Sequence, residues 1–172
     1  MPPEPLSEGG PDLRALEDQL REWLQGARSI VIAGIGNAIR RDDYVGVKVV
    51  EDLRDLASDR VRLIECETVP ESFVDEIVNM RPTHVLLVDA ALLGLPPGSA
   101  RLYGAEQVTS TAGISTHTLP IRVFCEYVTL LTGARIALLL IQPKDTEFGE
   151  GISPEVQGSA SKLESMLRSL LA

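Results

Sequence analysis

The chain has 172 residues and a formal net charge of −9, with 44% hydrophobic and 24% charged residues. This length favours a single globular domain, and the acidic balance argues against nucleic acid as a partner, because phosphate binding needs a basic face. The same charge disfavours an anionic membrane surface, and the apolar runs are too short to span a bilayer, so we expect no membrane insertion.

The cysteines and the first residues bear on the cellular compartment. Cys66 and Cys125 have no metal-like spacing, and two thiols in a chain of this size favour a reducing compartment over a disulfide framework. Residues 1–11 are rich in proline, glycine and glutamate, and they lack the basic and apolar regions of a signal peptide. We therefore expect a cytoplasmic protein whose residues 1–11 form a disordered tail.

Helices and strands alternate along the rest of the chain. Asp12 can cap a helix that runs to about Gln25. Strands are expected at 29–33, 61–65, 84–89, 100–103 and 134–141, and further helices at about 43–55, 71–79, 119–131 and 154–171. This alternation predicts a three-layer α/β/α fold, in which a mostly parallel twisted sheet of about five strands carries helices on both faces. We divide the chain into the tail, an N-terminal extension helix (12–28) and one α/β domain (29–172).

Polar residues follow the predicted strands at the edge where open α/β sheets bind ligands. They are Asn37, Asp42 and Asp43 after the first strand, Glu65 and Glu67 after the second, Asp89 at the end of the third, His117 before a helix and Gln142 after the last strand. Two aspartates and an imidazole can form an oxygen and nitrogen site for a divalent transition metal. A turn-forming aspartate and a surface histidine are the plainer alternatives for Asp89 and His117. His84 lies at the opposite end of its strand, where we expect a structural role.

The turn Gly34-Ile-Gly36 also suggests dinucleotide binding, but the third glycine of G-x-G-x-x-G is missing, since Ile39 occupies its position. Asp42 and Asp43 would in addition repel a pyrophosphate. A tight turn whose acidic residues are favoured by the helix dipole is a structural alternative.

A cysteine or serine nucleophile is disfavoured by the sequence. Cys125 falls in the middle of a predicted helix, and Cys66 sits between two glutamates that would raise its pKa. The chain also lacks G-x-S-x-G and H-E-x-x-H, the motifs of serine hydrolases and of common zinc proteases.

Three separated motifs resemble the signatures of the hydrogenase maturation endopeptidases. They are Gly34-Ile-Gly36-Asn37 with Asp42-Asp43 and Gly46, then Val88-Asp89-Ala90, then Ser115-Thr116-His117. Three further segments look most like the branch that serves formate-hydrogenlyase-type complexes: Arg81-Pro-Thr83, Gly94-Leu-Pro-Pro-Gly98 and Gly133 through Ile141-Gln-Pro143. The resemblance covers about residues 29–171.

The resemblance implies a nickel-dependent endopeptidase. Its substrate would be the precursor of a [NiFe]-hydrogenase large subunit, whose C-terminal extension it would remove after nickel insertion. The implied catalytic and metal-binding residues are Asp43, Asp89 and His117, which would engage Ni²⁺ carried by the precursor. Asn37, Glu65 and Thr68 are the implied substrate loop, and Asp42 matches the motif without being an implied ligand.

Two departures from the family pattern fall near this implied site. Tyr44 stands where members often have a small residue, and Glu65-Cys66-Glu67 stands where many have Asp-Gly-Gly. Two alternative functions stay open from the sequence. One is a non-catalytic maturation chaperone or docking module that binds the same precursor, and the other is a related processing protease with a different protein substrate.

Overall fold

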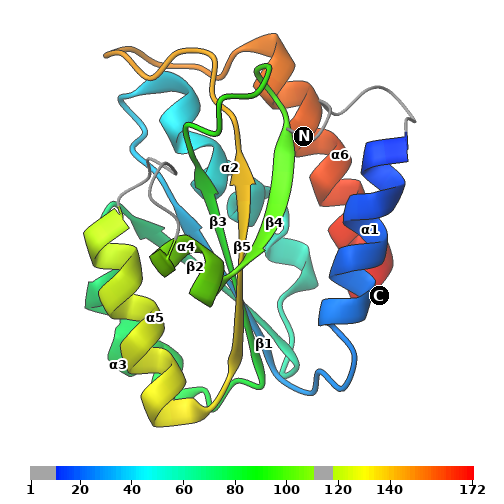
Figure 1. Cartoon of the computed structure of the whole chain (residues 1–172), viewed down its shortest axis with the longest axis vertical. Coiled ribbons are helices and arrows are strands. Elements are labelled where there is room, and N and C mark those ends of the chain that lie inside the picture. Colours follow the sequence, from blue (N-terminus) through cyan, green and yellow to red (C-terminus); the bar gives the residue numbers. More distant parts are fainter. Residues whose placement is uncertain (1–10, 111–117) are drawn as a thin grey trace.

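The computed structural model describes residues 11–110 and 118–172, and in this part of the chain a five-stranded sheet lies between two layers of helices (Figure 1). The strand order is β2-β1-β3-β5-β4. The strands are β1 (Ile30–Ile35), β2 (Val61–Glu67), β3 (His84–Ala90), β4 (Ala100–Gly104) and β5 (Arg135–Ile141). Only β4 is antiparallel to its neighbour among these described strands. The predicted three-layer fold with a mostly parallel sheet is confirmed.

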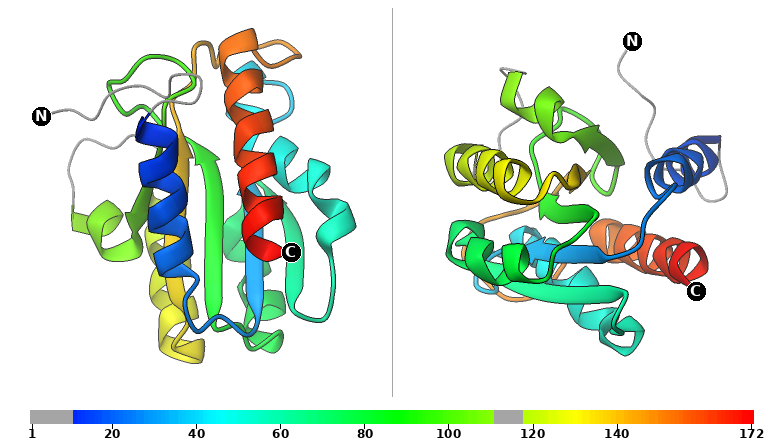
Figure 2. Two further views of the ribbon diagram at one scale, coloured as in Figure 1. Left: turned by 90° about the vertical axis from the view of Figure 1, so that its right-hand side faces the viewer. Right: turned by 90° about the horizontal axis from the view of Figure 1, so that it is seen from below.

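The helices cover both faces of the sheet (Figure 2). The α-helices are α1 (Pro11–Trp23), α2 (Val45–Asp52), α3 (Val74–Asn79), α4 (Ala105–Ser110), α5 (Thr118–Thr132) and α6 (Pro154–Leu171). Short 3-10 turns are η1 (Arg41–Tyr44), η2 (Arg54–Leu56) and η3 (Pro70–Phe73). Helices α1, α2 and α6 pack over one core, whereas α3 and α5 pack over the other. The central strands are therefore buried on both faces, which explains their continuous apolar runs.

Helix α1 belongs to the packed body of the molecule. Its Leu16 and Leu20 are buried in the same core as α6. Trp23 meets His84 edge to face, with ring centroids 5.0 Å apart. His84 begins β3 at the end of the strand opposite Asp89, as the sequence predicted, and burial lowers its pKa.

Several element boundaries differ from the prediction. The helix expected at about 43–55 is divided into η1, α2 and η2, since the chain turns tightly before and after α2. Strand β2 continues through Glu67, because its pairing with β1 persists across a register shift at Ile35. Glu65 and Glu67 therefore lie in β2 and not after it, and α4 was not predicted. Helix α1 includes Pro11, and the rest of the predicted tail lies outside the described residues.

No helix within residues 11–110 and 118–172 combines the length and apolar character that a membrane crossing requires.

Candidate functional site

Three glycines allow η1 and α2 to pack against the carboxyl ends of β1 and β3. A Cβ atom on Gly34 would lie 2.4 Å from the carbonyl oxygen of Gly46, and one on Gly46 would lie 2.1 Å from that of Val88. A Cβ on Gly36 would lie 2.3 Å from the carbonyl oxygen of Asp43. Only glycine fits at such distances. The glycine motif is thus a close-packing device, which accounts for it without a phosphate ligand.

This packing brings the two motif aspartates to the same end of the sheet. Asp43 lies in η1, which packs against β3, and only 8% of its surface is exposed. Its Oδ2 accepts a hydrogen bond from the backbone N–H of Asn37 at 3.1 Å. Asp89 is the penultimate residue of β3, directly after Val88, and is fully buried. Two buried carboxylates in one place are costly unless bonded or neutralised, which is typical of a functional site.

The third predicted ligand, His117, lies outside the described residues. The helix that follows, α5, begins at Thr118 and runs toward the amino end of the sheet, where β5 starts (Figure 1). Among the described residues alone, no group of three histidine, cysteine, aspartate or glutamate side chains could hold a metal. The described part of the predicted metal site therefore consists of Asp43 and Asp89.

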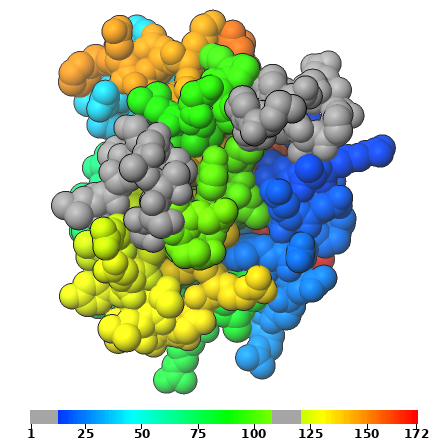
Figure 3. All heavy atoms as spheres, viewed as in Figure 1, coloured from blue at the N-terminus to red at the C-terminus, as the bar shows by residue number. Residues whose placement is uncertain are grey.

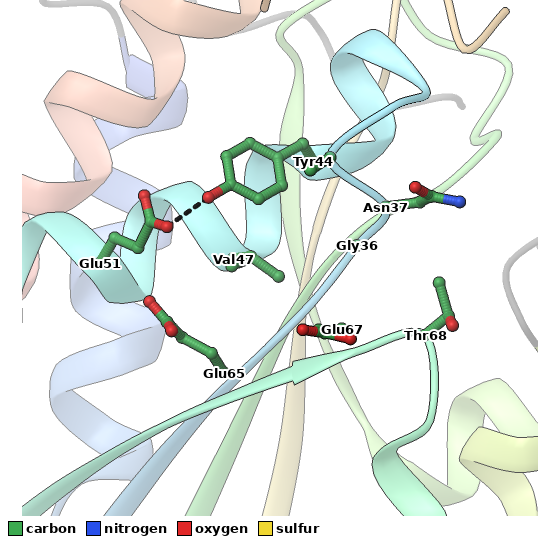
Figure 4. A pocket seen from close by; sticks show the side chains of 9 residues that line it. Gly36, Asn37, Tyr44, Val47, Glu51, Glu65, Glu67 and Thr68 are labelled. Carbon is green, nitrogen blue, oxygen red and sulfur yellow. Dashed lines mark hydrogen bonds between the residues drawn. The ribbon is translucent and has the colours of Figure 1, made fainter. Parts of the chain in front are cut away.

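A cavity of about 340 Å³ opens between α2 and the end of β2 (Figure 4). Its lining residues are Gly36, Asn37, Ala38, Tyr44, Val47, Glu51, Glu65, Glu67 and Thr68. Asn37, Glu65 and Thr68 are the three residues predicted as the substrate loop. The structure brings them together in the lining of this one cavity, beside η1. The sequence reasoning missed Glu51, which reaches the cavity from α2 one helical turn after Val47.

Hydrogen bonds hold two of the cavity carboxylates. The Tyr44 hydroxyl donates to Glu51, and the Arg54 guanidinium donates to Glu65 at 2.7 Å. Burial, followed by the hydrogen bond to Glu51, raises the pKa of Tyr44 to about 12, so the hydroxyl stays a donor at any physiological pH. Tyr44 therefore forms part of the cavity wall in place of the small residue that is frequent in the family.

The Glu65-Cys66-Glu67 departure has a structural explanation. Cys66 is fully buried in the core beneath α3 and α5, so its side chain fills space that a glycine would leave empty. Glu67 has a φ of 51°, a left-handed conformation that favours glycine and costs another residue about 1–2 kcal/mol. Its carbonyl oxygen accepts a hydrogen bond from Gly36 at 2.7 Å, and its side chain faces the cavity (Figure 4). The strained position thus adds a carboxylate to the lining.

Neither thiol is suited to nucleophilic chemistry. Burial raises the pKa of both Cys66 and Cys125 to about 12. The glutamates that add to the shift at Cys66 are Glu76 and Glu71, so the prediction that its flanking glutamates cause the shift is wrong. The reason is that successive side chains of a strand point to opposite faces.

Gln142 has a structural position rather than a place in a polar cluster. It is buried, and its Oε1 accepts a hydrogen bond from the backbone N–H of Leu93 at 2.6 Å. This bond ties the segment after β3 to the end of β5.

Comparisons with known proteins agree with this fold. The sequence profile of the HycI family, described as hydrogenase maturation protease, matches residues 47–169. A Methanocaldococcus jannaschii protein, provisionally assigned as a hydrogenase maturation protease, is 33% identical over 160 residues, covering 88% of this chain and 94% of that protein. The hydrogenase 3 maturation protease of Escherichia coli is 27% identical over 113 residues, covering 66% of this chain and 72% of its own.

A solved structure extends the similarity to three dimensions. The [NiFe] hydrogenase maturation protease HycI from Thermococcus kodakarensis superposes with a TM-score of 0.81 at 34% identity, covering 89% of this chain and 98% of that one. The family match and the fold together define the class, an α/β peptidase that matures hydrogenases. Within this class, the chain belongs to the HycI family of hydrogenase maturation proteases.

Proposed function

We propose that this protease removes the C-terminal extension from the precursor of a [NiFe]-hydrogenase large subunit, and that it acts after nickel has been inserted. The observation that carries the proposal is the pair of buried aspartates, Asp43 and Asp89, at one end of the sheet. Close glycine packing places Asp43 there, although the two residues are far apart in sequence.

Nickel enters this proposal as part of the substrate. Carboxylates and a neutral imidazole are suitable donors for a divalent transition metal. Asp43, Asp89 and His117 would engage the nickel that the precursor carries, so an unloaded precursor would lack the group that completes the complex. When present, the metal can serve as a loading check or as a Lewis acid toward the scissile carbonyl or a bound water.

The cavity beside η1 supports a place for the substrate chain. Asn37, Glu65 and Thr68 line it, and the backbone N–H of Asn37 also holds the carboxylate of Asp43. A peptide in this cavity would therefore lie next to one of the proposed metal ligands. The carboxylates of Glu51, Glu65 and Glu67 give the lining an acidic character, which favours a tail that carries no excess of negative charge.

The test is cleavage of a hydrogenase large-subunit precursor with and without nickel, followed by intact mass. We expect the nickel-loaded precursor alone to lose a C-terminal peptide. Asp43→Asn, Asp89→Asn and His117→Gln should each slow the cleavage, whereas Asp59→Asn is the matched control, since Asp59 is exposed in the turn before β2. Equal cleavage by wild type and all three site variants would refute the proposed site.

The same assay separates the alternative functions. Stable binding of the loaded precursor without any cleavage would indicate a docking module. Cleavage of a different protein, with the hydrogenase precursors untouched, would indicate a related processing protease.

A further inference from the structure

Asp42, the neighbour of Asp43, is the anchor of the segment that joins β5 to α6. Its side chain is fully buried. Its Oδ2 accepts hydrogen bonds from the backbone N–H groups of Lys144 and Asp145 at 2.9 and 3.1 Å, and from the Ser153 hydroxyl at 2.8 Å. Its Oδ1 accepts one from the backbone N–H of Ser153 at 2.7 Å. Four donors to one carboxylate make a strong, charge-assisted arrangement.

Backbone hydrogen bonds join the same two segments around this carboxylate. The N–H of Asp42 donates to the carbonyl oxygen of Asp145 at 3.0 Å, and that of Arg41 donates to Gly149 at 3.1 Å. In return, the N–H of Gly149 donates to the carbonyl oxygen of Ile39 at 3.0 Å. Figure 3 shows the two segments in contact at the top of the molecule, in cyan and orange. The segment 144–153 and η1 are therefore one structural unit.

The Ser153 hydroxyl bonds to the Asp42 carboxylate and does not cap its own helix. Ser153 is the N-cap residue of α6, where a serine hydroxyl usually accepts a hydrogen bond from the first turn of the helix. Its hydroxyl makes no such capping bond and donates instead to Asp42. Removing this hydroxyl would weaken the anchor without removing a side-chain cap from α6.

We propose that Asp42 is a positioning residue that fixes Asp43 in the site. Asp42 and Asp43 are consecutive residues of the four-residue turn η1, so anchoring one restricts the other. One carboxylate faces the segment 144–153, and the other receives the Asn37 N–H at the end of the sheet. If the anchor loosens, Asp43 loses its fixed relation to Asn37. The proposal rests on the proposed function for its effect on cleavage, but its structural part can be tested separately.

The test uses Ser153→Ala, because Asp42→Asn would place an amide N–H₂ against N–H donors and could prevent folding. The matched control is Thr83→Val. The Thr83 hydroxyl accepts hydrogen bonds from the N–H groups of Arg28 and Ser29 and donates one to the Ser29 carbonyl oxygen, at the amino end of the sheet. Both variants lose hydrogen bonds and stability, but only Ser153→Ala removes a hydrogen bond to Asp42.

Two readouts distinguish positioning from a general loss of stability. In Ser153→Ala, we expect the Asn37 amide to exchange hydrogen about tenfold faster relative to the amides of β3, the order expected for losing one bond to a charged group. We also expect kcat for precursor cleavage to fall about tenfold with KM within a factor of about two. Thr83→Val should change neither quantity.

Unchanged Asn37 exchange and unchanged kcat in Ser153→Ala would overturn the inference. An equal response to Thr83→Val would overturn it too, because the effect would then follow stability alone. If the wild type cleaves no precursor, the proposed function fails, and the Asn37 exchange still decides whether Asp42 positions Asp43.

Discussion

Gly46 is the residue at which the packing of the site can be tested most simply. Replacing it by alanine adds a methyl group 2.1 Å from the carbonyl oxygen of Val88 and 2.4 Å from that of Ile35. Both oxygens belong to central strands, so α2 must move away from the sheet. Alanine gains about 1 kcal/mol over glycine in helix propensity. Overpacking a dense core typically costs about 1–3 kcal/mol. The cost here exceeds that range, because the atoms in the way are backbone carbonyl oxygens, which cannot change rotamer as a side chain can. We expect a net loss of about 3 kcal/mol.

Urea unfolding followed by the fluorescence of Trp23, the single tryptophan, measures this loss. Gly158→Ala is the matched control, since Gly158 lies in α6 and a Cβ there would meet nothing within 4 Å. It should raise stability by about 0.5–1 kcal/mol through propensity alone. A Gly46→Ala protein as stable as the wild type would show that η1 and α2 are not held against β3 as described.

Three other predictions concern residues away from the predicted metal ligands. Burial and the neighbouring Asp52 raise the pKa of Glu164 from 4.5 to about 7. The ionised carboxylate therefore destabilises the folded state, and this loss of stability is absent below pH 4.5 and complete above pH 7. Glu164→Gln should therefore add about 1–2 kcal/mol at pH 8 and almost nothing at pH 4.5, and equal gains at both pH values in thermal unfolding would contradict this. Cys66 and Cys125 should resist iodoacetamide at pH 8 in the native protein and react in urea; fast native labelling would show that the thiols are accessible. Leu20→Ala should cost about 2–5 kcal/mol, as measured by urea unfolding, because Leu20 is fully buried; a cost below about 0.5 kcal/mol would show that α1 is dispensable.

The parts of the fold that the sequence predicts are those set by local patterns. Strand β3 is a run of apolar residues closed by Asp89, and the spacing of Leu16 and Leu20 marks the buried face of α1. The order of the strands and the antiparallel direction of β4 depend on contacts between distant segments, which no local pattern contains. The division of the second helix into η1, α2 and η2 also escaped prediction.

The site was predictable to the extent that parallel strands end at one edge of the sheet. This rule alone predicts that the segment containing Asp43 lies near Asp89. It says nothing about Asp42, whose bond to the Ser153 N–H spans 111 positions in sequence. It also misses the contribution of Glu51, since the direction of a helical side chain depends on how α2 is rotated against the sheet.

The two neighbouring aspartates of the first motif show how one short sequence can serve two purposes. Asp42 turns inward to the segment 144–153, whereas Asp43 remains at the end of the sheet beside Asn37. Both aspartates lie in the four-residue turn η1, and their side chains accept hydrogen bonds from different segments. The glycines around η1 provide the space for that turn.

The most direct test of the central claim is the rate at which Asp89→Asn cleaves a nickel-loaded hydrogenase precursor. Asparagine keeps the size of the fully buried side chain, so circular dichroism and unfolding can confirm that the variant is folded. If Asp89 engages the metal of the precursor, kcat/KM should fall by about 100-fold or more. Cleavage within a factor of about two of the wild-type rate would contradict the assignment of this end of the sheet as the active site.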